Sequence, residues 1–123
     1  AKRISNLFMM SIAQSGFTVN FPYTFDLQAK HIAWIIERAK TREWKQLEVT
    51  AEAEAAWGDE VVERGGQSTE FSENCTPGYY NNEGTANLKN RQGSFFIGGP
   101  TEFADRLEAW RAAEKCEGLE VRT

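Results

Sequence analysis

The chain has 123 residues, of which 41% are hydrophobic and 26% are charged, a balance that is ordinary for a globular unit of one domain. Its formal net charge is -4 and its longest basic run is the pair Lys2-Arg3, which excludes the electrostatic footprint of a nucleic-acid-binding or membrane-surface protein. The longest apolar stretch, Leu7 to Met10, is far too short to span a bilayer, so we expect a cytoplasmic protein with no membrane partner.

Residues 5–23 are predicted to form a strand followed by a loop. Residues 7–12 read Leu-Phe-Met-Met-Ser-Ile, a mostly apolar run of strand length that is typical of a strand buried on both faces. Gln14-Ser15-Gly16 then predicts a loop, and Pro22 restrains the chain before the first helix because its ring fixes the φ angle.

A helix over residues 26–40 is predicted from its cap and its apolar periodicity. Thr24 is the expected N-cap, and Asp26 places a negative charge near the positive end of the helix dipole. Apolar residues recur at alternating steps of four and three, which predicts the inner face of the helix. These residues are Phe25, Ala29, Ile32, Ile36 and Ala39.

Two more helices are predicted, over residues 51–63 and 101–116. Thr50 and Thr101 stand at their starts as the expected N-caps. Residues 46–50 alternate between polar and apolar side chains, which predicts a short strand or an extended connector between the first two helices.

The later part of the chain changes in character. Residues 67–91 are rich in small and polar residues and predict a long irregular loop, whereas residues 94–97 predict a strand before the last helix. The chain thus combines three helices with three short strands and a long irregular loop, which is α+β for an isolated piece. Because the strands are so widely separated, the pattern favours a segment that adds its elements to a larger α/β body.

Six short motifs follow one another along nearly the whole chain. They are Asn6-Leu7-Phe8-Met9-Met10, Gly16–Tyr23, His31–Ile35, Thr50–Trp57, Cys75–Gly84, and Phe96–Gly99 followed by Phe103. In this order they resemble the C-terminal region of the flavin-dependent Baeyer–Villiger monooxygenases. Each motif alone is common, but six in the right order are hard to obtain by chance.

The resemblance implies both a fold and a function. Residues 1–123 would form a single segment, the C-terminal part of the FAD domain in a flavoprotein with two dinucleotide-binding domains. The parent enzyme would use FAD and NADPH to insert an oxygen atom into a ketone, giving an ester or a lactone. The partners of the segment would be the ketone substrate and the missing FAD and NADPH domains.

Two departures limit what the resemblance carries over. Thr76 and Thr85 stand where the family commonly has a Trp and a Lys, so contacts of those residues with the nicotinamide cofactor are not expected here. No GxGxxG motif occurs in the chain, so we expect the segment alone to bind neither cofactor tightly and to be inactive. Residues 75–82 resemble the form of this stretch in members that act on bulky ketones.

The resemblance also places the loop after the first strand beside the flavin. Gly16, Phe17 and Asn20 are then the predicted cofactor-binding residues, since glycine permits a close backbone approach and asparagine offers a donor and an acceptor. Phe17, Val19 and Phe21 are the predicted apolar walls of the ketone pocket. The alternative, from the residues alone, is that Phe17 and Phe21 only pack beneath the next helix.

No catalytic residue and no metal site are predicted. His31 is the single histidine and has no carboxylate or serine at a partnering spacing, so we expect it to be solvated or to cap a helix. Cys75 and Cys116 are far apart and form no CxxC motif, which predicts two reduced thiols.

A second interpretation stays open from the sequence. The chain is then a stand-alone α+β ligand-binding or interaction module, whose binding surface is the loop over residues 67–91. In both interpretations apolar strands without a covering partner invite association. We therefore expect a homo-oligomer if the chain is isolated.

Overall fold

The computed structural model describes residues 4–16, 18–64, 96 and 98–123. Within them the chain forms three helices and two strands. In chain order these are α1 (Phe21–Thr41), β1 (Gln46–Val49), α2 (Ala51–Arg64), α5 (Gly99–Ala113) and β2 (Leu119–Arg122).

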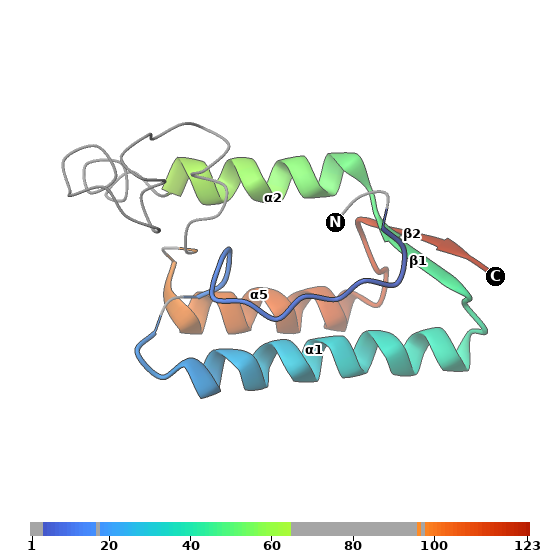
Figure 1. Cartoon of the computed structure of the whole chain (residues 1–123), viewed down its shortest axis with the longest axis horizontal. Helices are drawn as coiled ribbons and strands as arrows, with labels where there is room; N and C mark the ends of the chain where they lie inside the picture. Colours follow the sequence, from blue (N-terminus) through green and yellow to red (C-terminus); the bar gives the residue numbers. More distant parts are fainter. Residues whose placement is uncertain (1–3, 17, 65–95, 97) are drawn as a thin grey trace.

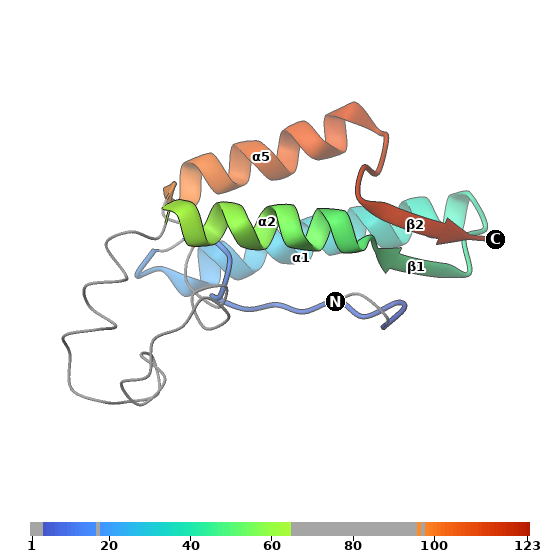
Figure 2. The same cartoon turned by 90° about the horizontal axis from the view of Figure 1, so that it is seen from above.

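The helices run alongside one another, and the sheet lies at one end of them (Figure 1). α1 and α5 pack against each other, and β1 pairs with β2. Seen from above, most of the segment 4–13 follows the side of the molecule that is opposite to α5 (Figure 2). The predicted class, α/β with three helices, is confirmed.

The start of α1 lies earlier than predicted. Asn20 is its N-cap, and the Asn20 side chain accepts a hydrogen bond from the Tyr23 amide at 3.4 Å. Pro22 occupies the first turn, where its fixed φ suits the helix and its missing N–H needs no partner. Thr24, the predicted cap, therefore lies inside the helix, where it is buried.

The inward face of α1 is one residue step away from the predicted apolar stripe. Ile36 of that stripe is 44% exposed, whereas Ile35 and Thr24 are buried. Phe25, Ile32 and Ala39 of the stripe are half-buried, so the prediction is correct only in part. The most buried residues lie one step earlier, about 100° around the helix. The residues with inward contacts are Thr24, Gln28, His31, Ile35 and Arg38.

Thr50 joins β1 to α2 and caps the helix as predicted. Its hydroxyl accepts a hydrogen bond from the Ala53 amide at 3.2 Å, and its carbonyl accepts one from the Glu54 amide at 3.1 Å. Its own amide donates to the Gly118 carbonyl at 2.9 Å, which ties the start of α2 to the start of β2.

Both ends of α5 differ from the predicted helix over residues 101–116. Gly98 is the N-cap, so Thr101 lies in the first turn and is not the cap. Glu114 ends the helix with φ 53°, and Cys116 follows with φ 49°. The backbone thus enters the left-handed region directly after Ala113, and the helical hydrogen bonds cannot continue.

The sheet consists of β1 and β2 in an antiparallel pair. Leu47 lies opposite Val121 and Val49 lies opposite Leu119. The predicted short strand over residues 46–50 is therefore confirmed. β2 was not predicted. From the sequence, Gly118 was interpreted only as the end of a helix, whereas in the structure its φ of 86° also turns the chain back toward β1.

The predicted strand over residues 7–12 is not formed. The segment is irregular, and Leu7 is 45% and Met9 71% exposed. No described strand lies beside it to complete a ladder, and a lone strand cannot satisfy its backbone groups. Just before the segment, Asn6 is bonded to β1 in both directions: its amide donates to the Leu47 carbonyl at 2.9 Å, and its side-chain oxygen accepts from the Leu47 amide at 2.8 Å.

Only part of the later predictions can be followed in the structure. The irregular loop over residues 67–91 lies outside the described residues. Of the predicted strand over residues 94–97, Phe96 is described, and it forms a single parallel bridge with Gly16. The Phe96 amide donates to the Ser15 carbonyl at 2.9 Å.

The best-buried part of the core lies between α2 and α5. Phe96 and Val61 have no exposed surface, and Phe103 is 7% exposed. The Phe96 ring stacks on Trp57 with 5.2 Å between centroids. Arg106 lies 5.1 Å from the Phe96 centroid and forms an ion pair with Glu60 of α2 at 2.5 Å. A cation over an aromatic face thus covers the edge of this core.

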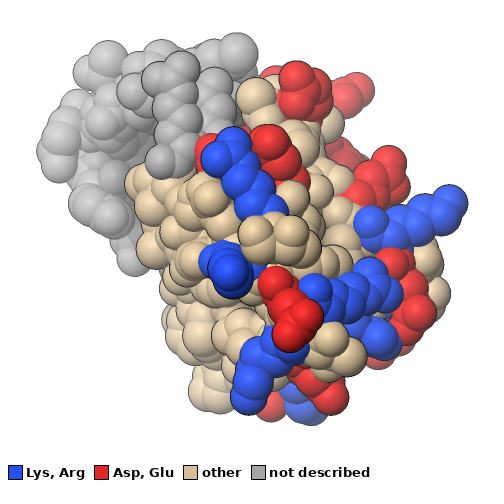
Figure 3. All heavy atoms as spheres, turned by 90° about the vertical axis from the view of Figure 1, so that its right-hand side faces the viewer, with Lys and Arg blue, Asp and Glu red and all other residues tan. Residues whose placement is uncertain are grey.

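Charged residues cover the end of the molecule where the sheet lies. Acidic and basic side chains are interspersed over this face, with no large region of one sign (Figure 3). The face therefore offers no basic patch of the kind that binds nucleic acid.

The exposed apolar residues of the segment 4–13 predict association of the isolated chain. Met9→Lys should shift it toward the monomer, because a charge at a 71% exposed position prevents apolar contact between copies. Ala55→Lys, also at an exposed position but on α2, is the matched control and should leave association unchanged. Light scattering at high concentration measures both. A monomeric unmodified chain would contradict the prediction and favour a self-sufficient module.

Candidate functional site

The predicted site residues lie on the loop between the N-terminal segment and α1. The structure divides this loop into two parts with different surroundings. Residues 11–16, here called the inner loop, are half-buried or buried, whereas residues 18–21, the outer loop, are mostly exposed. Phe17, predicted to contact both flavin and ketone, lies outside the described residues.

Two side chains of α1 hold the inner loop by its backbone. The Gln28 side-chain amide donates to the Ser11 carbonyl at 2.7 Å, and the Ser11 amide donates back to the Gln28 side-chain oxygen at 3.0 Å. One helical turn earlier, the Thr24 hydroxyl donates to the Gly16 carbonyl at 3.2 Å. Both ends of the inner loop are therefore fixed to the same helix.

Ser15 stabilises the inner loop from within. Its side chain is 2% exposed, and its hydroxyl lies 3.0 Å from the Ser11 carbonyl and 2.9 Å from the Ile12 carbonyl. A buried hydroxyl requires such partners, since leaving it without them costs about 1–3 kcal/mol. The inner loop is thus stabilised by hydrogen bonds within itself, in addition to those with α1.

Gly16 has a packing reason to be glycine. A Cβ at this position would lie 2.7 Å from the Pro100 Cα, 2.8 Å from the Gly99 carbonyl oxygen and 2.9 Å from the Phe103 Cβ. Two of these three neighbours are backbone atoms, which cannot move aside easily. The close approach that the sequence assigned to a flavin ring is therefore made, in this structure, to the start of α5.

The outer loop presents apolar side chains to solvent. Val19 is 89% and Phe21 41% exposed, which is unusual for large apolar residues on a loop whose other end is buried. The exposure of Phe21 counts against the alternative that it only packs beneath the helix. Asn20 uses its side-chain oxygen for the N-cap of α1.

A cavity of about 990 Å³ lies elsewhere, between the N-terminal segment and the three helices. Its walls are mainly apolar and include Leu7, Ile35, Leu47, Trp57 and Phe103. None of Gly16, Val19, Asn20 or Phe21 lines it. Of the predicted pocket residues, the two that the structure describes, Val19 and Phe21, therefore do not lie at this cavity.

An aromatic and cationic cluster between α1 and α5 escaped the sequence analysis. The His31 ring lies 5.0 Å from that of Trp110, and Trp34 meets Trp110 edge-on at 5.9 Å. His31 Nδ1 is 3.1 Å from an Arg111 guanidinium nitrogen. The Trp110 indole donates to the Glu117 carbonyl at 3.0 Å.

His31 is neutral in this cluster. Burial, and next the positive charge of Arg111, lower the pKa of His31 to about 4. The neutral ring can then accept a hydrogen bond from Arg111 through Nδ1. The expectation of a solvated or capping histidine is therefore wrong. The sequence held no signal for this, because the apolar periodicity placed Ile36 and not Ile35 on the inward face.

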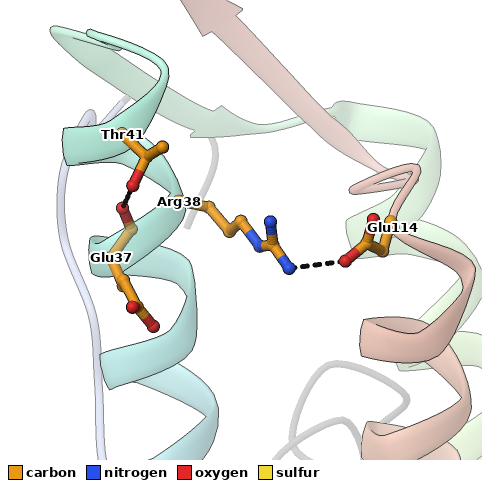
Figure 4. A network of polar contacts seen from close by, with 4 residues as sticks. All are labelled: Glu37, Arg38, Thr41 and Glu114. Carbon is orange, nitrogen blue, oxygen red and sulfur yellow. Dashed lines mark hydrogen bonds and ion pairs between the residues drawn. The ribbon is translucent and has the colours of Figure 1, made fainter.

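A second contact between α1 and α5 lies at their ends near the sheet (Figure 4). Arg38 and Glu114 form an ion pair with 2.5 Å between their charged atoms. The Arg38 guanidinium also lies 4.9 Å from the centroid of Trp34. In the last turn of α1 the Thr41 hydroxyl donates to the Glu37 carbonyl at 2.9 Å. These contacts hold the ends of α1 and α5 together and do not suggest a catalytic role.

Neither a metal-binding cluster nor a membrane-spanning helix occurs among the residues that the structure describes. Among the residues that the structure describes, no three His, Cys, Asp or Glu side chains gather as metal ligands. In the same part of the chain no helix has the length and apolarity needed to cross a membrane. Cys116 is free and buried, and Cys75 lies outside the described residues.

Comparison with known proteins now gives the relationship. No family model matches the chain. The chain is 35% identical over 115 residues to the FAD-binding monooxygenase hmp7 of Hypomyces subiculosus, covering 94% of this chain and 19% of that protein. It is 34% identical over 117 residues to the Baeyer-Villiger monooxygenase ATR8 of Stachybotrys chlorohalonatus, with the same coverage of 94% and 19%. The chain belongs to the Baeyer–Villiger monooxygenase family.

The fold supports the same relationship. The polycyclic ketone monooxygenase from the thermophilic fungus Thermothelomyces thermophila superimposes with a TM-score of 0.83 at 28% identity. The match covers 100% of this chain and 20% of that one. The chain thus spans about a fifth of the length of these Baeyer–Villiger monooxygenases, and it corresponds to a segment of such an enzyme.

The His31 cluster predicts a specific pH dependence for this Baeyer–Villiger monooxygenase segment. The pKa of His31 is lower in the folded chain than the ordinary value of 6.5, so the unfolded chain binds the proton first as pH falls. The contribution of His31 to stability is complete above pH 6.5 and is lost between pH 6.5 and about 4. His31→Gln keeps an acceptor for Arg111 but does not titrate.

Urea unfolding at a series of pH values measures this effect. The unfolding free energy of the unmodified chain should fall more steeply than that of His31→Gln as pH is lowered from 6.5 to 4. Carboxylates titrate in both proteins, so only the difference between the two slopes reports on His31. Equal slopes would mean that the ring is solvated.

Proposed function

We propose that the chain is the C-terminal part of an FAD- and NADPH-dependent monooxygenase that inserts oxygen into a bulky ketone to give an ester or a lactone. Family membership supports FAD as the cofactor of the parent enzyme. NADPH, the class of ketone and the C-terminal position rest on the resemblance of the sequence motifs. The proposal keeps the cytoplasmic location that the sequence predicts.

The observation that carries the proposal is the contrast within one loop. Buried hydrogen bonds fix the inner loop to α1, while the outer loop leaves Val19 and Phe21 uncovered. A rigid support with apolar tips fits the wall of a site for a planar ring or an apolar ketone. Such a wall excludes water and orients a ketone without carrying a catalytic group.

The residues present fit one part of the cofactor and not another. Apolar side chains of the outer loop suit the flavin ring or the ketone beside it. The pyrophosphate needs a glycine-rich turn before a helix, and this sequence has no GxGxxG motif. When bound, FAD supplies the oxygen chemistry, and this chain contributes shape and the exclusion of water.

The test compares the full-length enzyme with the 123-residue chain. The full-length enzyme, loaded with FAD, should oxidise NADPH in the presence of a polycyclic ketone and release a product with one more oxygen atom. The isolated chain should hold no FAD and consume no NADPH, because it lacks the phosphate-binding motif. A flavin-loaded full-length enzyme that leaves every ketone unchanged would overturn the proposal.

Phe21 is predicted to affect the choice of substrate and not the cofactor. In the full-length enzyme Phe21→Ala should change the ratio of kcat/KM between a bulky and a small ketone, because one apolar contact is lost. The change corresponds to about 1–3 kcal/mol of discrimination between the two ketones. Flavin content should remain normal, since the phosphates are held elsewhere. The same change at Phe17, which the structure does not describe, tests the resemblance directly.

Trp110→Ala is the control for this experiment. Trp110 is half-buried and packs against His31 and Trp34, far along α5 from the loop, so its loss should lower stability by less than the roughly 3–5 kcal/mol that a fully buried Trp costs. The ratio between the two ketones should not change. If both substitutions impair folding and neither alters the ratio, Phe21 belongs to the scaffold.

A further inference from the structure

Two polar residues lie on the inward face of α1, where apolar residues would be the simpler choice. Thr24 is 2% exposed and Gln28 is half-buried. Removing such groups from water is unfavourable unless each finds a hydrogen-bond partner. Both find one in the inner loop, so their presence requires an explanation in terms of that loop.

The hydrogen bonds described for their side chains go to backbone atoms. Gln28 pairs with the amide and the carbonyl of Ser11, and Thr24 donates to the carbonyl of Gly16. Contacts of this kind define the position of the chain whatever side chains the loop carries. They are also directional, because a hydrogen bond weakens steeply with distance and angle, unlike apolar packing.

The opposite side of the inner loop is closed by α5. Gly16 lies against Gly99, Pro100 and Phe103 so closely that a Cβ would not fit. Its carbonyl, held by Thr24, is therefore fixed from two directions. Asn20 caps α1 and fixes the far end of the outer loop in turn.

We propose that Thr24 and Gln28 are positioning residues that fix where the outer loop presents Val19 and Phe21 to the flavin and the ketone. This inference rests on the proposed function. Both would act through the backbone of residues 11–16, to which their side chains are hydrogen-bonded. A small displacement of that backbone moves the apolar wall, and misplacement of about 1 Å typically costs on the order of a hundredfold in rate.

Matched substitutions in the full-length, FAD-loaded enzyme test the proposal. Thr24→Val keeps the shape and removes the hydroxyl, Thr24→Ser keeps the hydroxyl, and Gln28→Met keeps the length without the amide. Ile35→Val, on the same buried face of α1 but at a side chain that can form no hydrogen bond to the loop, is the control for lost packing. The measurements are kcat, KM for the ketone, and the fraction of oxidised NADPH that yields product.

Thr24→Val and Gln28→Met should each lower kcat and the product fraction by roughly tenfold, with a smaller change in KM. Thr24→Ser should restore both to within about twofold, because the hydrogen bond is kept. Ile35→Val should leave the product fraction unchanged. If Thr24→Val behaves as the unmodified enzyme, or if Ile35→Val causes the same loss, the two residues are only structural and the proposal is wrong.

Hydrogen exchange separates this proposal from the proposed function. Thr24→Val should speed exchange of the Ser15 and Phe96 amides, which lie in or beside the inner loop, and Ile35→Val should not. If Thr24→Val exchanges faster but the enzyme oxidises no ketone, the proposed function is wrong and the role of Thr24 in holding the inner loop stands. If exchange is unchanged in an enzyme that oxidises ketones, the proposed function stands and the role of Thr24 is wrong.

Discussion

Phe96 is a buried residue at which three parts of the chain meet: α2, α5 and the inner loop. It has no exposed surface, its ring stacks on Trp57 of α2, and it lies 6.2 Å from Phe103 of α5. Its backbone amide donates to Ser15 in the inner loop. A single buried ring therefore sets the spacing of two helices, and the same residue holds the loop beside them. The position of the inner loop, and with it that of the candidate site, therefore depends on the contacts of Phe96.

Much of the secondary structure could be predicted because its signals are local. Thr50 caps α2 through its own side chain, and β1 alternates within four residues, so no distant partner is needed. The orientation of α1 could not be predicted in the same way. Thr24 and Gln28 turn inward because they have partners in a loop earlier in the chain, and periodicity of apolar residues carries no information on such partners.

Two strand predictions failed because composition alone does not reveal a pairing partner: one predicted strand is not formed, and one observed strand was not predicted. Residues 7–12 have the composition of a buried strand but find no described neighbour, whereas β2 is short and partly charged yet pairs fully with β1. Pairing decides a strand more than composition does. For the site, Gly16 is instructive: the sequence predicts a close approach to the flavin ring, which stays a prediction, and the fold shows a different close approach, to Gly99 and Pro100.

Glu114 illustrates how a tertiary contact can override a local preference. It occupies a left-handed position at the end of α5, where glycine or asparagine is the usual residue. Its carboxylate pairs there with Arg38, which is far away in the sequence. If this pair is what holds the acid at position 114, a lineage that loses the arginine would be free to drift toward glycine. Among relatives, the two positions should change together more often than either changes alone.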